Sequence, residues 1–344
     1  MRTIDTIKNL SGKTVLLRID CDVDIEDGKV LDDTRLAAAL STIELLLKKG
    51  GEINLLGHLG RPEGEDKNFT LEPIARWFGN KLKGEPQSIT VGKLKGWKIT
   101  DTVSLIENIR FFPEEEKNDE KFARELALLG DIYVNEAFAV CHREHASIVG
   151  VTKFLPSYAG LHLEKEVLEL SKIMQNPKRP LAVLIGGAKI ETKLPLVSKM
   201  HHIADYVLVG GEIAEQTRVL IKVQHEKIVG RKAAVLVSES TEQGLDITVK
   251  SVENFKQVLG LANTIVWNGP VGLIGSEDTE RGTRDLAQFI VGTKAYKVVG
   301  GGDTLSYLRR INLIDKFDFV STGGGAMLEF LSGHKLPGIA ALER

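Results

Sequence analysis

The chain has 344 residues, of which 42% are hydrophobic and 27% charged, and its formal net charge is -2. This length exceeds the roughly 100–200 residues of one domain, so two domains are expected. The near balance of charge gives no reason to expect nucleic acid or an anionic membrane surface as a partner. No apolar run reaches the roughly 18 residues of a membrane span, and the first residues lack the apolar core of a signal peptide, so we expect a cytoplasmic protein.

Short apolar runs alternate with helical patterns from residue 14 onward, which is typical of a parallel sheet with helices on its faces. In the first half we expect strands at 14–20, 53–62, 103–111 and 132–138. Helical patterns lie at 32–50, where Asp32 and Asp33 can cap the first turn, and at 71–82 and 121–129. This half is therefore predicted to be an α/β unit of about four strands.

A long helical pattern at 161–175 has the length of a connector between domains. A second alternating series follows it, with expected strands at 181–187, 206–211, 233–238, 264–270, 296–304 and 317–326. The predicted fold class is α/β, with two doubly wound parallel-sheet, Rossmann-like domains joined by a helical hinge. We expect an N-terminal domain at 1–160, a connecting helix at 161–177, a C-terminal domain at 178–328 and a C-terminal segment at 329–344.

The two halves carry different residues where their strands end, and ligands of such sheets bind at that edge. In the first half these residues are Arg18, Asp20, Asp22, His58, Arg61, Arg110, His142 and Arg143. In the second half the strands run into glycines, at 186–187, 210–211, 300–302 and 323–325, with Asn268 and Asp303 beside them. Guanidinium groups suit a small anionic substrate, whereas glycine loops with an aspartate suit a nucleotide polyphosphate with Mg²⁺.

The stretch from Val183 to Lys193 is the clearest phosphate signal in the chain. A buried strand leads into Gly186 and Gly187, and Lys189 and Lys193 follow at a spacing of four on the next helix. Backbone amides, the helix dipole and two cations would meet a phosphate chain there. The alternative is a tight turn followed by two solvated lysines. The chain has neither a P-loop motif nor a dinucleotide fingerprint, so those two nucleotide folds lose support.

Several motifs together resemble the phosphoglycerate kinase family from end to end. They are RIDCDVD (18–24), DDTR (32–35), GHLGRP (57–62), ENIRF (107–111), VNEAFAVCHREHAS (134–147), GGAKIETK (186–193), VWNGPVG (266–272), GGGDT (300–304), STGGGA (321–326) and LPGIAAL (336–342). The resemblance implies a monomeric glycolytic or gluconeogenic enzyme. Its N-terminal domain would bind 3-phosphoglycerate, its C-terminal domain would bind Mg-ATP or Mg-ADP, and the last helix would return to the N-terminal domain.

The resemblance also implies a role for individual residues. Those that would hold 3-phosphoglycerate are Asp20, Asp22, Arg35, His58, Arg61, Arg110 and Arg143. Those that would hold the nucleotide are Gly187, Ala188, Lys193, Gly211, Asn268, Gly301, Gly302, Asp303 and Thr304, with Asp303 on Mg²⁺. Those that would act on the transferred phosphoryl group are Arg35, Lys189, Gly324 and Gly325.

The chain departs from the family pattern at a few positions. Family members usually have Asn at Asp22, Ser at Gly57 and Asp at Glu136, and an acidic ribose ligand at Gly275, for which Glu277 or Asp278 are alternatives. The segment between Gly211 and Trp267 is also shorter than usual. Two other functions therefore stay open: a nucleotide- or phosphometabolite-binding regulatory protein that has lost turnover, and a kinase for another phosphorylated carboxylic acid.

Overall fold

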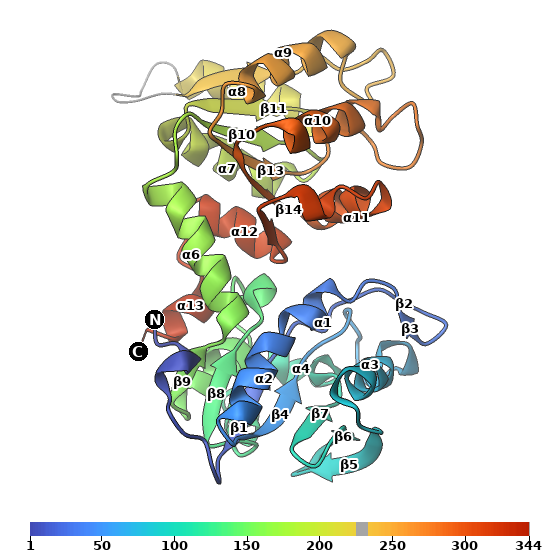
Figure 1. The fold of residues 1–344 in the computed structure, drawn as a ribbon, viewed down its shortest axis with the longest axis vertical. Helices are drawn as coiled ribbons and strands as arrows, with labels where there is room; N and C mark the ends of the chain where they lie inside the picture. Colours follow the sequence, from blue (N-terminus) through green and yellow to red (C-terminus); the bar gives the residue numbers. More distant parts are fainter. Residues whose placement is uncertain (225–232, 344) are drawn as a thin grey trace. The chain divides into compact units, whose positions relative to one another are not determined.

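The computed structural model describes residues 1–224 and 233–343, with side chains omitted at 220–224 (Figure 1). The chain forms two compact units. Unit 1 contains Met1–Val167 and Lys335–Arg344, and unit 2 contains Leu168–His334. Within the described ranges, no helix is long and apolar enough to cross a membrane.

Unit 1 is built on a seven-stranded sheet with the order β5-β6-β7-β4-β1-β8-β9. Its strands are β1 (Thr14–Arg18), β4 (Glu52–Leu56), β5 (Gln87–Val91), β6 (Leu94–Lys98), β7 (Val103–Ile106), β8 (Ile132–Asn135) and β9 (Ser157–Ala159). Five of them pair in parallel, whereas β5 and β6 form an antiparallel hairpin at one edge. A second hairpin joins β2 (Ile25–Glu26) to β3 (Lys29–Val30). The four expected strands are confirmed, and β5, β6 and β9 are additional.

The helices of unit 1 lie mostly in the connections between these strands. They are α1 (Thr34–Ala38), α2 (Leu40–Lys48), α3 (Glu72–Leu82), α4 (Pro113–Glu116), α5 (Glu120–Ala127) and α13 (Pro337–Ala341), and α6 (Leu161–Gln175) begins in this unit. The expected helix over 32–50 is interrupted at Ala39, which separates α1 from α2. Strand residues of both parities are fully buried, including Leu16 and Leu17, so both faces of the sheet are covered.

Unit 2 is built on a six-stranded sheet that is parallel throughout, with the order β12-β11-β10-β13-β14-β15. Its strands are β10 (Leu181–Ile185), β11 (Tyr206–Val209), β12 (Ala234–Val237), β13 (Thr264–Asn268), β14 (Tyr296–Gly300) and β15 (Phe319–Ser321). Counted along the unit, this order is 3-2-1-4-5-6, the Rossmann order. All six expected strands are confirmed, and the Rossmann-like prediction with them.

Helices cover both faces of the second sheet. They are α7 (Ile190–Ile203), α8 (Ala214–Gln224), α9 (Val249–Leu259), α10 (Arg281–Gly292), α11 (Gly302–Arg310) and α12 (Gly324–Leu331). Leu184 and Trp267 belong to one core cluster with Phe255 of α9 and Leu286 of α10. Val183, which precedes Leu184 in β10 and points to the other face of the sheet, is also fully buried. Every residue of β10 is therefore buried. An unbroken apolar run is what a strand covered on both faces requires.

Candidate active site

The strand order of each sheet reverses at one point, and the loops that follow the strands there form a natural binding crevice. In unit 1 the reversal lies between β1 and β8, and in unit 2 it lies between β10 and β13. The residues singled out by the sequence follow these strands and their neighbours: His58 follows β4, for example, and Arg110 follows β7. Each unit therefore presents its own candidate site, and the two sites differ in chemistry.

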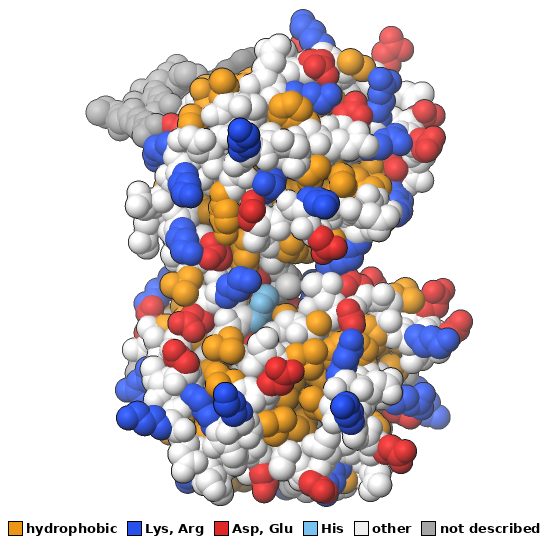
Figure 2. Space-filling model, in the orientation of Figure 1, with side chains coloured by type: hydrophobic (Ala, Val, Ile, Leu, Met, Phe, Trp, Pro, Cys, Tyr) orange, Lys and Arg blue, Asp and Glu red, His pale blue; other side chains and the backbone are white. Residues whose placement is uncertain are grey.

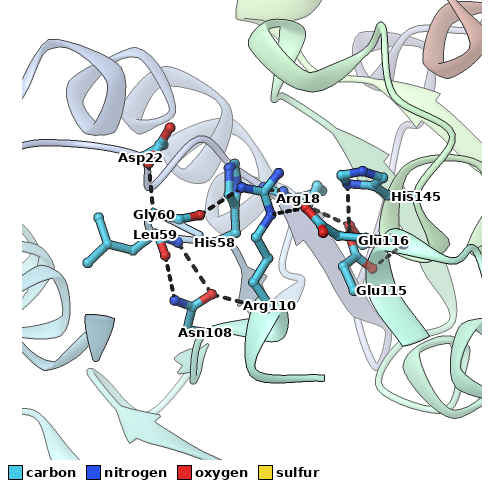
Figure 3. A network of polar contacts seen from close by, with 11 residues as sticks. Arg18, Asp22, His58, Leu59, Gly60, Asn108, Arg110, Glu115, Glu116 and His145 are labelled. Atoms are coloured by element: carbon cyan, nitrogen blue, oxygen red, sulfur yellow. Dashed lines mark hydrogen bonds and ion pairs between the residues drawn. The ribbon is translucent and has the colours of Figure 1, made fainter. Parts of the chain in front are cut away.

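Arg18, the last residue of β1, is a buried residue that contacts other side chains of the site in unit 1 (Figure 3). Its side chain is 1% exposed, and its Nε donates to Ser147 Oγ at 3.0 Å. Its Nη2 lies 2.9 Å from His58 Nδ1, and Nη1 donates to the Ile19 carbonyl. Since an arginine can only donate, His58 Nδ1 accepts and its Nε2 carries the proton. Burial, together with the positive charge of Arg18, lowers the pKa of His58 well below its usual value, so the ring is neutral.

A fully buried carboxylate balances the charge of Arg18. Glu115 in α4 accepts hydrogen bonds from Ser147 N at 2.9 Å and Ser147 Oγ at 2.6 Å, and His145 Nδ1 lies 3.8 Å from it. Burial raises the pKa of Glu115, while the nearby Arg18 lowers it. Burial also lowers the pKa of His145 to about 3, with Arg110 and Arg18 adding to the effect. Two neutral imidazoles thus lie beside a paired guanidinium.

Asn108 fixes the loop that carries His58, and it also fixes the start of the segment that carries Arg110 (Figure 3). Its Nδ2 donates to the Leu59 carbonyl at 2.8 Å and the Phe69 carbonyl at 2.9 Å. Its Oδ1 accepts from the amides of Leu59 at 3.3 Å and Arg110 at 3.1 Å. Every hydrogen-bonding group of this buried amide is used, so the loop has little freedom.

Arg110 reaches across to the same loop. Its Nη1 donates to the Gly60 carbonyl at 2.7 Å, and its Nε lies 3.3 Å from Glu116 Oε1. Burial lowers the pKa of Arg110, although guanidinium remains charged at any physiological pH. Arg143 lies close enough for its charge to lower that pKa further. Two guanidinium groups this close repel each other, so an anion between them would be favoured.

Asp20, Asp22 and Arg35 form a second cluster after β1. Arg35 Nη1 lies 3.3 Å from Asp20 Oδ2 and donates to the Asp22 carbonyl at 2.9 Å. Burial raises the pKa of Asp20, and Arg35 opposes that shift. The Asp22 carboxylate accepts from the Gly60 amide at 2.9 Å, and its other oxygen lies 3.9 Å from Arg35 Nη1. Asp22, which departs from the family pattern, therefore accepts a hydrogen bond from the backbone of Gly60, and Arg35 partly offsets its negative charge.

Unit 1 brings most of its predicted substrate residues into one network. Asp20, Asp22, Arg35, His58 and Arg110 are joined through hydrogen bonds, ion pairs and the shared loop at Gly60. Arg61 is exposed and Arg143 is half-buried, and neither side chain has a partner among the described residues. An unpaired guanidinium at the end of a parallel sheet is available to an external anion.

The site of unit 2 is made first of backbone. Gly186 and Gly187 follow β10, and Gly269 follows β13, where Ile185 is paired with Asn268. A Cβ at Gly269 would collide with the Gly186 carbonyl and the Lys193 ammonium. Gly187 and Gly269 also have φ values of +92° and +94°, which L-residues with a Cβ rarely adopt. Only glycine lets these two loops approach so closely.

Lys193 does not match the alternative interpretation of a solvated lysine. It is 6% exposed, and its Nζ donates to the Gly186 carbonyl and lies 3.3 Å from Asn268 Oδ1. Burial lowers its pKa to about 8, the carboxylate of Asp303 raises it, and the charge of Lys189 lowers it. Lys189 itself is exposed at the N-cap of α7. The two lysines therefore lie in different environments, one within the glycine loops and one in solvent.

A cavity of about 480 Å³ opens beside these loops. Four of the predicted nucleotide residues line it: Gly187, Ala188, Gly211 and Asp303. Apolar side chains from two later segments form other parts of its wall, including Leu245, Val271, Leu273 and Ile274. A cavity with glycine amides and apolar walls suits a phosphorylated nucleoside.

The remaining predicted residues of unit 2 support the cavity or lie near its glycine loops. Asn268 and Thr304 are buried, and Thr304 Oγ1 accepts from the Gly269 amide at 2.9 Å. Gly301 has a φ of +98° directly before α11. A Cβ on Gly324 would lie 3.9 Å from the Gly302 amide, so the first turns of α11 and α12 are neighbours. Gly325 is exposed at the start of α12.

Asp303 fits the magnesium role that the sequence suggests. In the described part of the chain, no group of three or more His, Cys, Asp or Glu side chains is arranged to hold a metal ion. Magnesium bound with a nucleotide needs only one or two carboxylates, because phosphate oxygens and water complete its shell. Asp303 is exposed in the first turn of α11 and lines the cavity, so its carboxylate is suited to that task.

Several side chains of the two candidate sites carried no signal in the sequence. Arg18 was noted at a strand end without a role, and Asn108, Glu115 and Ser147 were not selected at all. In unit 2 the cavity is also lined by Glu212 and Asp246, which the sequence did not indicate. Glu277 and Asp278 are exposed and are not among the residues lining it, and Gly275 is exposed with open space around its α-carbon.

The sequence matches the family model described as phosphoglycerate kinase over residues 4–228 and 216–334. It is 38% identical to the phosphoglycerate kinase of Coprothermobacter proteolyticus, with 96% of each chain covered. It is likewise 38% identical to that of Pseudothermotoga lettingae, with 98% of each chain covered. The latter alignment runs over 392 positions, so the present chain of 344 residues is the shorter one.

Solved structures agree with the sequence relatives. The structure of phosphoglycerate kinase from Coxiella burnetii has a TM-score of 0.83 at 31% identity, covering 99% of this chain and 98% of that one. The enzyme from Pyrococcus horikoshii has a TM-score of 0.81 at 28% identity, covering 100% and 98%. The regulatory protein and the kinase of another acid are not favoured by these similarities. The chain belongs to the phosphoglycerate kinase family.

Proposed function

We propose that this protein catalyses reversible, Mg²⁺-dependent phosphoryl transfer between ATP and the carboxylate of 3-phosphoglycerate, giving ADP and 1,3-bisphosphoglycerate. The observation that carries the proposal is the pairing of two unlike sites in one family member. One is an arginine-rich network in unit 1, and the other is a glycine-lined cavity with Asp303 in unit 2. Each suits one of the two substrates.

In unit 1, the guanidinium groups of Arg61, Arg110 and Arg143 would bind the existing phosphate of 3-phosphoglycerate. Arg35 would face the carboxylate that receives the phosphoryl group, and the neutral His58 would donate from Nε2. Arg18 and Asn108 would act as positioning residues, because their hydrogen bonds end on His58 and on the loop that would contact the substrate. A carboxylate is already a nucleophile, so no general base is needed.

In unit 2, the amides of the glycine loops and Lys193 would hold the nucleotide phosphates. Lys189 and the amides of Gly324 and Gly325 would stabilise charge on the phosphoryl group during transfer. Bound beside Asp303, Mg²⁺ would neutralise phosphate charge. Gly325 is exposed in the first turn of α12, which is a position suited to binding an anion.

The deciding experiment is turnover of 3-phosphoglycerate with Mg-ATP, coupled to NADH oxidation by glyceraldehyde-3-phosphate dehydrogenase. We expect a kcat between about 1 and 10³ s⁻¹, the usual range for enzymes. GTP run in parallel would measure the nucleotide preference. Folded protein that binds Mg-ATP but shows no turnover with 3-phosphoglycerate would overturn the proposal, and a panel of other phosphorylated carboxylic acids would then identify the acceptor.

A further inference from the structure

Three carboxylates line the nucleotide cavity, and two of them already have tasks. Asp246 is 6% exposed, and it accepts from the Ile247 amide at 2.8 Å and the Gly282 amide at 2.8 Å. The bond from Gly282 ties the Asp246 segment of the cavity wall to the first turn of α10. Asp303 lines the cavity from the first turn of α11, directly after the glycine run, and its charge raises the pKa of Lys193, so it lies where phosphates are expected.

Glu212 is the third carboxylate, and it differs from the other two. It is exposed in a short 3-10 helix (Gly211–Ile213), directly after a glycine of the cavity lining. Among the residues that the structure describes, no hydrogen bond or ion pair engages its side chain. A Cβ at Gly211 would lie 2.9 Å from the Gly187 amide, so the segment that carries Glu212 lies next to the first glycine loop. A free carboxylate lining a cavity can accept hydrogen bonds from a bound ligand.

The loop where the family resemblance places a ribose ligand offers no such group. Gly275 has no side chain, and Glu277 lies 3.9 Å from Arg284 and outside the cavity lining. We propose that Glu212 is the specificity-determining residue of the nucleotide cavity, accepting a hydrogen bond from a donor of the nucleoside. The donor is a ribose hydroxyl or the exocyclic amine of the base. This inference rests on the proposed nucleotide role of unit 2.

The negative charge of Glu212 means that the sign of one change in affinity can test the proposal. A carboxylate near a diphosphate repels it, so a Glu212 that made no bond to the nucleoside would weaken binding, and its removal would tighten it. A Glu212 that accepts a charge-assisted hydrogen bond has the opposite effect. The sign of the change on Glu212→Ala therefore separates the two cases.

The test measures ADP dissociation constants by calorimetry for the full chain and for Glu212→Ala and Glu212→Gln. We expect ADP to bind about tenfold more weakly to Glu212→Ala, the range for a hydrogen bond to a charged group. Glu277→Gln, which changes an exposed carboxylate outside the cavity, should leave the affinity unchanged. Thermal melting and 3-phosphoglycerate binding check that each variant is folded.

Ligand analogues identify the donor. The full chain and Glu212→Ala are compared with 2′-deoxy-ADP, 3′-deoxy-ADP and inosine diphosphate, as in a double-mutant cycle. If the chain loses affinity for one analogue while Glu212→Ala does not, the missing group is the donor, and the proposal holds. Unchanged or tighter ADP binding to Glu212→Ala, or equal losses for all analogues in both proteins, overturns it. Failure of the full chain to bind any nucleotide would instead overturn the proposed function.

Discussion

The two units present their ligand edges in opposite ways. In unit 1 the site rests on buried charged and polar side chains, in which Arg18, Asn108 and Glu115 are each held by hydrogen bonds. In unit 2 it rests on backbone that only glycine can form, with one buried cation, Lys193, among carbonyl oxygens. Side-chain networks of the first kind link binding to stability. In the backbone site of unit 2, binding and stability depend on different groups. Exposed side chains such as Lys189 and Asp303 are not needed to hold the glycine loops in place.

The surfaces of the two units do not show this contrast. On the face drawn in Figure 2, Lys and Arg side chains are interspersed with Asp and Glu over both units. Such mixing agrees with a net charge of -2. The difference lies at the ends of the strands, where single residues rather than overall charge decide what binds.

The largest effect should follow from Lys189→Ala in unit 2. We expect kcat to fall by about 10² to 10³, as when one donor to a developing charge is removed. The urea midpoint should not move, because the side chain is exposed at the N-cap of α7. Lys250→Ala, an equally exposed lysine in the first turn of α9, is the matched control and should keep full activity. Unchanged turnover in Lys189→Ala would remove the role that we assign to it.

Arg18→Met should show the converse in unit 1. The substitution leaves Glu115 buried without its opposing charge and His58 without its donor, and we expect a loss of about 3 kcal/mol in the free energy of unfolding. Urea titration measures it. Arg61→Met, at the same edge but exposed, should change stability by less than about 0.5 kcal/mol while weakening substrate binding. Equal midpoints for Arg18→Met and the parent chain would show that the network contributes no stability.

The pH dependence of binding should also differ between the units. Burial lowers the pKa of Lys193 to about 8, so its ammonium is lost as the pH rises above 8. We expect ADP affinity to fall above that pH, by at most about tenfold per unit if only the ammonium form binds. Affinity for 3-phosphoglycerate should stay flat from pH 7 to 9.5, because guanidinium stays charged and His58 is already neutral.

Lys193→Arg supplies the control for this profile, since a guanidinium does not titrate in the range. Its ADP affinity, measured by calorimetry, should be independent of pH between 7 and 9.5. Stability follows the opposite sign: between pH 8 and 10.5 the unfolded chain binds more protons at Lys193, so its contribution to stability rises with pH. An ADP affinity that is flat in the parent chain would contradict the assignment of Lys193 to the phosphates.

The smallest effect is expected for Asp22→Asn. The amide oxygen can still accept from the Gly60 amide, while the negative charge beside an anionic substrate disappears. Because Asp22 is part exposed and already faces Arg35, we expect 3-phosphoglycerate to bind up to about fivefold more tightly. Asp27→Asn, in the turn between β2 and β3, should leave the dissociation constant unchanged. Weaker binding of Asp22→Asn would mean that the charge orients Arg35 rather than opposing the substrate.

Another departure from the family pattern is explained by packing. Gly57 follows β4, and a Cβ there would overlap the buried sulfur of Cys21. The serine usual in the family would therefore not fit unless Cys21 moved. The sequence showed both residues, but their contact depends on the pairing of β1 with β4.

Periodicity in the sequence was sufficient for most of the fold. Continuous apolar runs such as Leu181–Ile185 can be stable only inside a covered sheet, and amphipathic spacing predicted α3 and α6. The hairpin of β5 and β6 was missed because neither strand contains an apolar run and most of β5 is exposed. The break at Ala39 was missed because the apolar spacing continues through it.

The sequence by itself determined the fold class, the family and the residues at the strand ends, because local spacing and parallel topology place those ends at one edge. Only the tertiary structure decided what supports them. Asn108 and Glu115 form hydrogen bonds with partners distant in sequence. Lys193 is buried against carbonyl groups, and Glu212 lines the cavity of unit 2. Burial and hydrogen-bond partners depend on which segments meet in space, and a linear pattern does not contain that information.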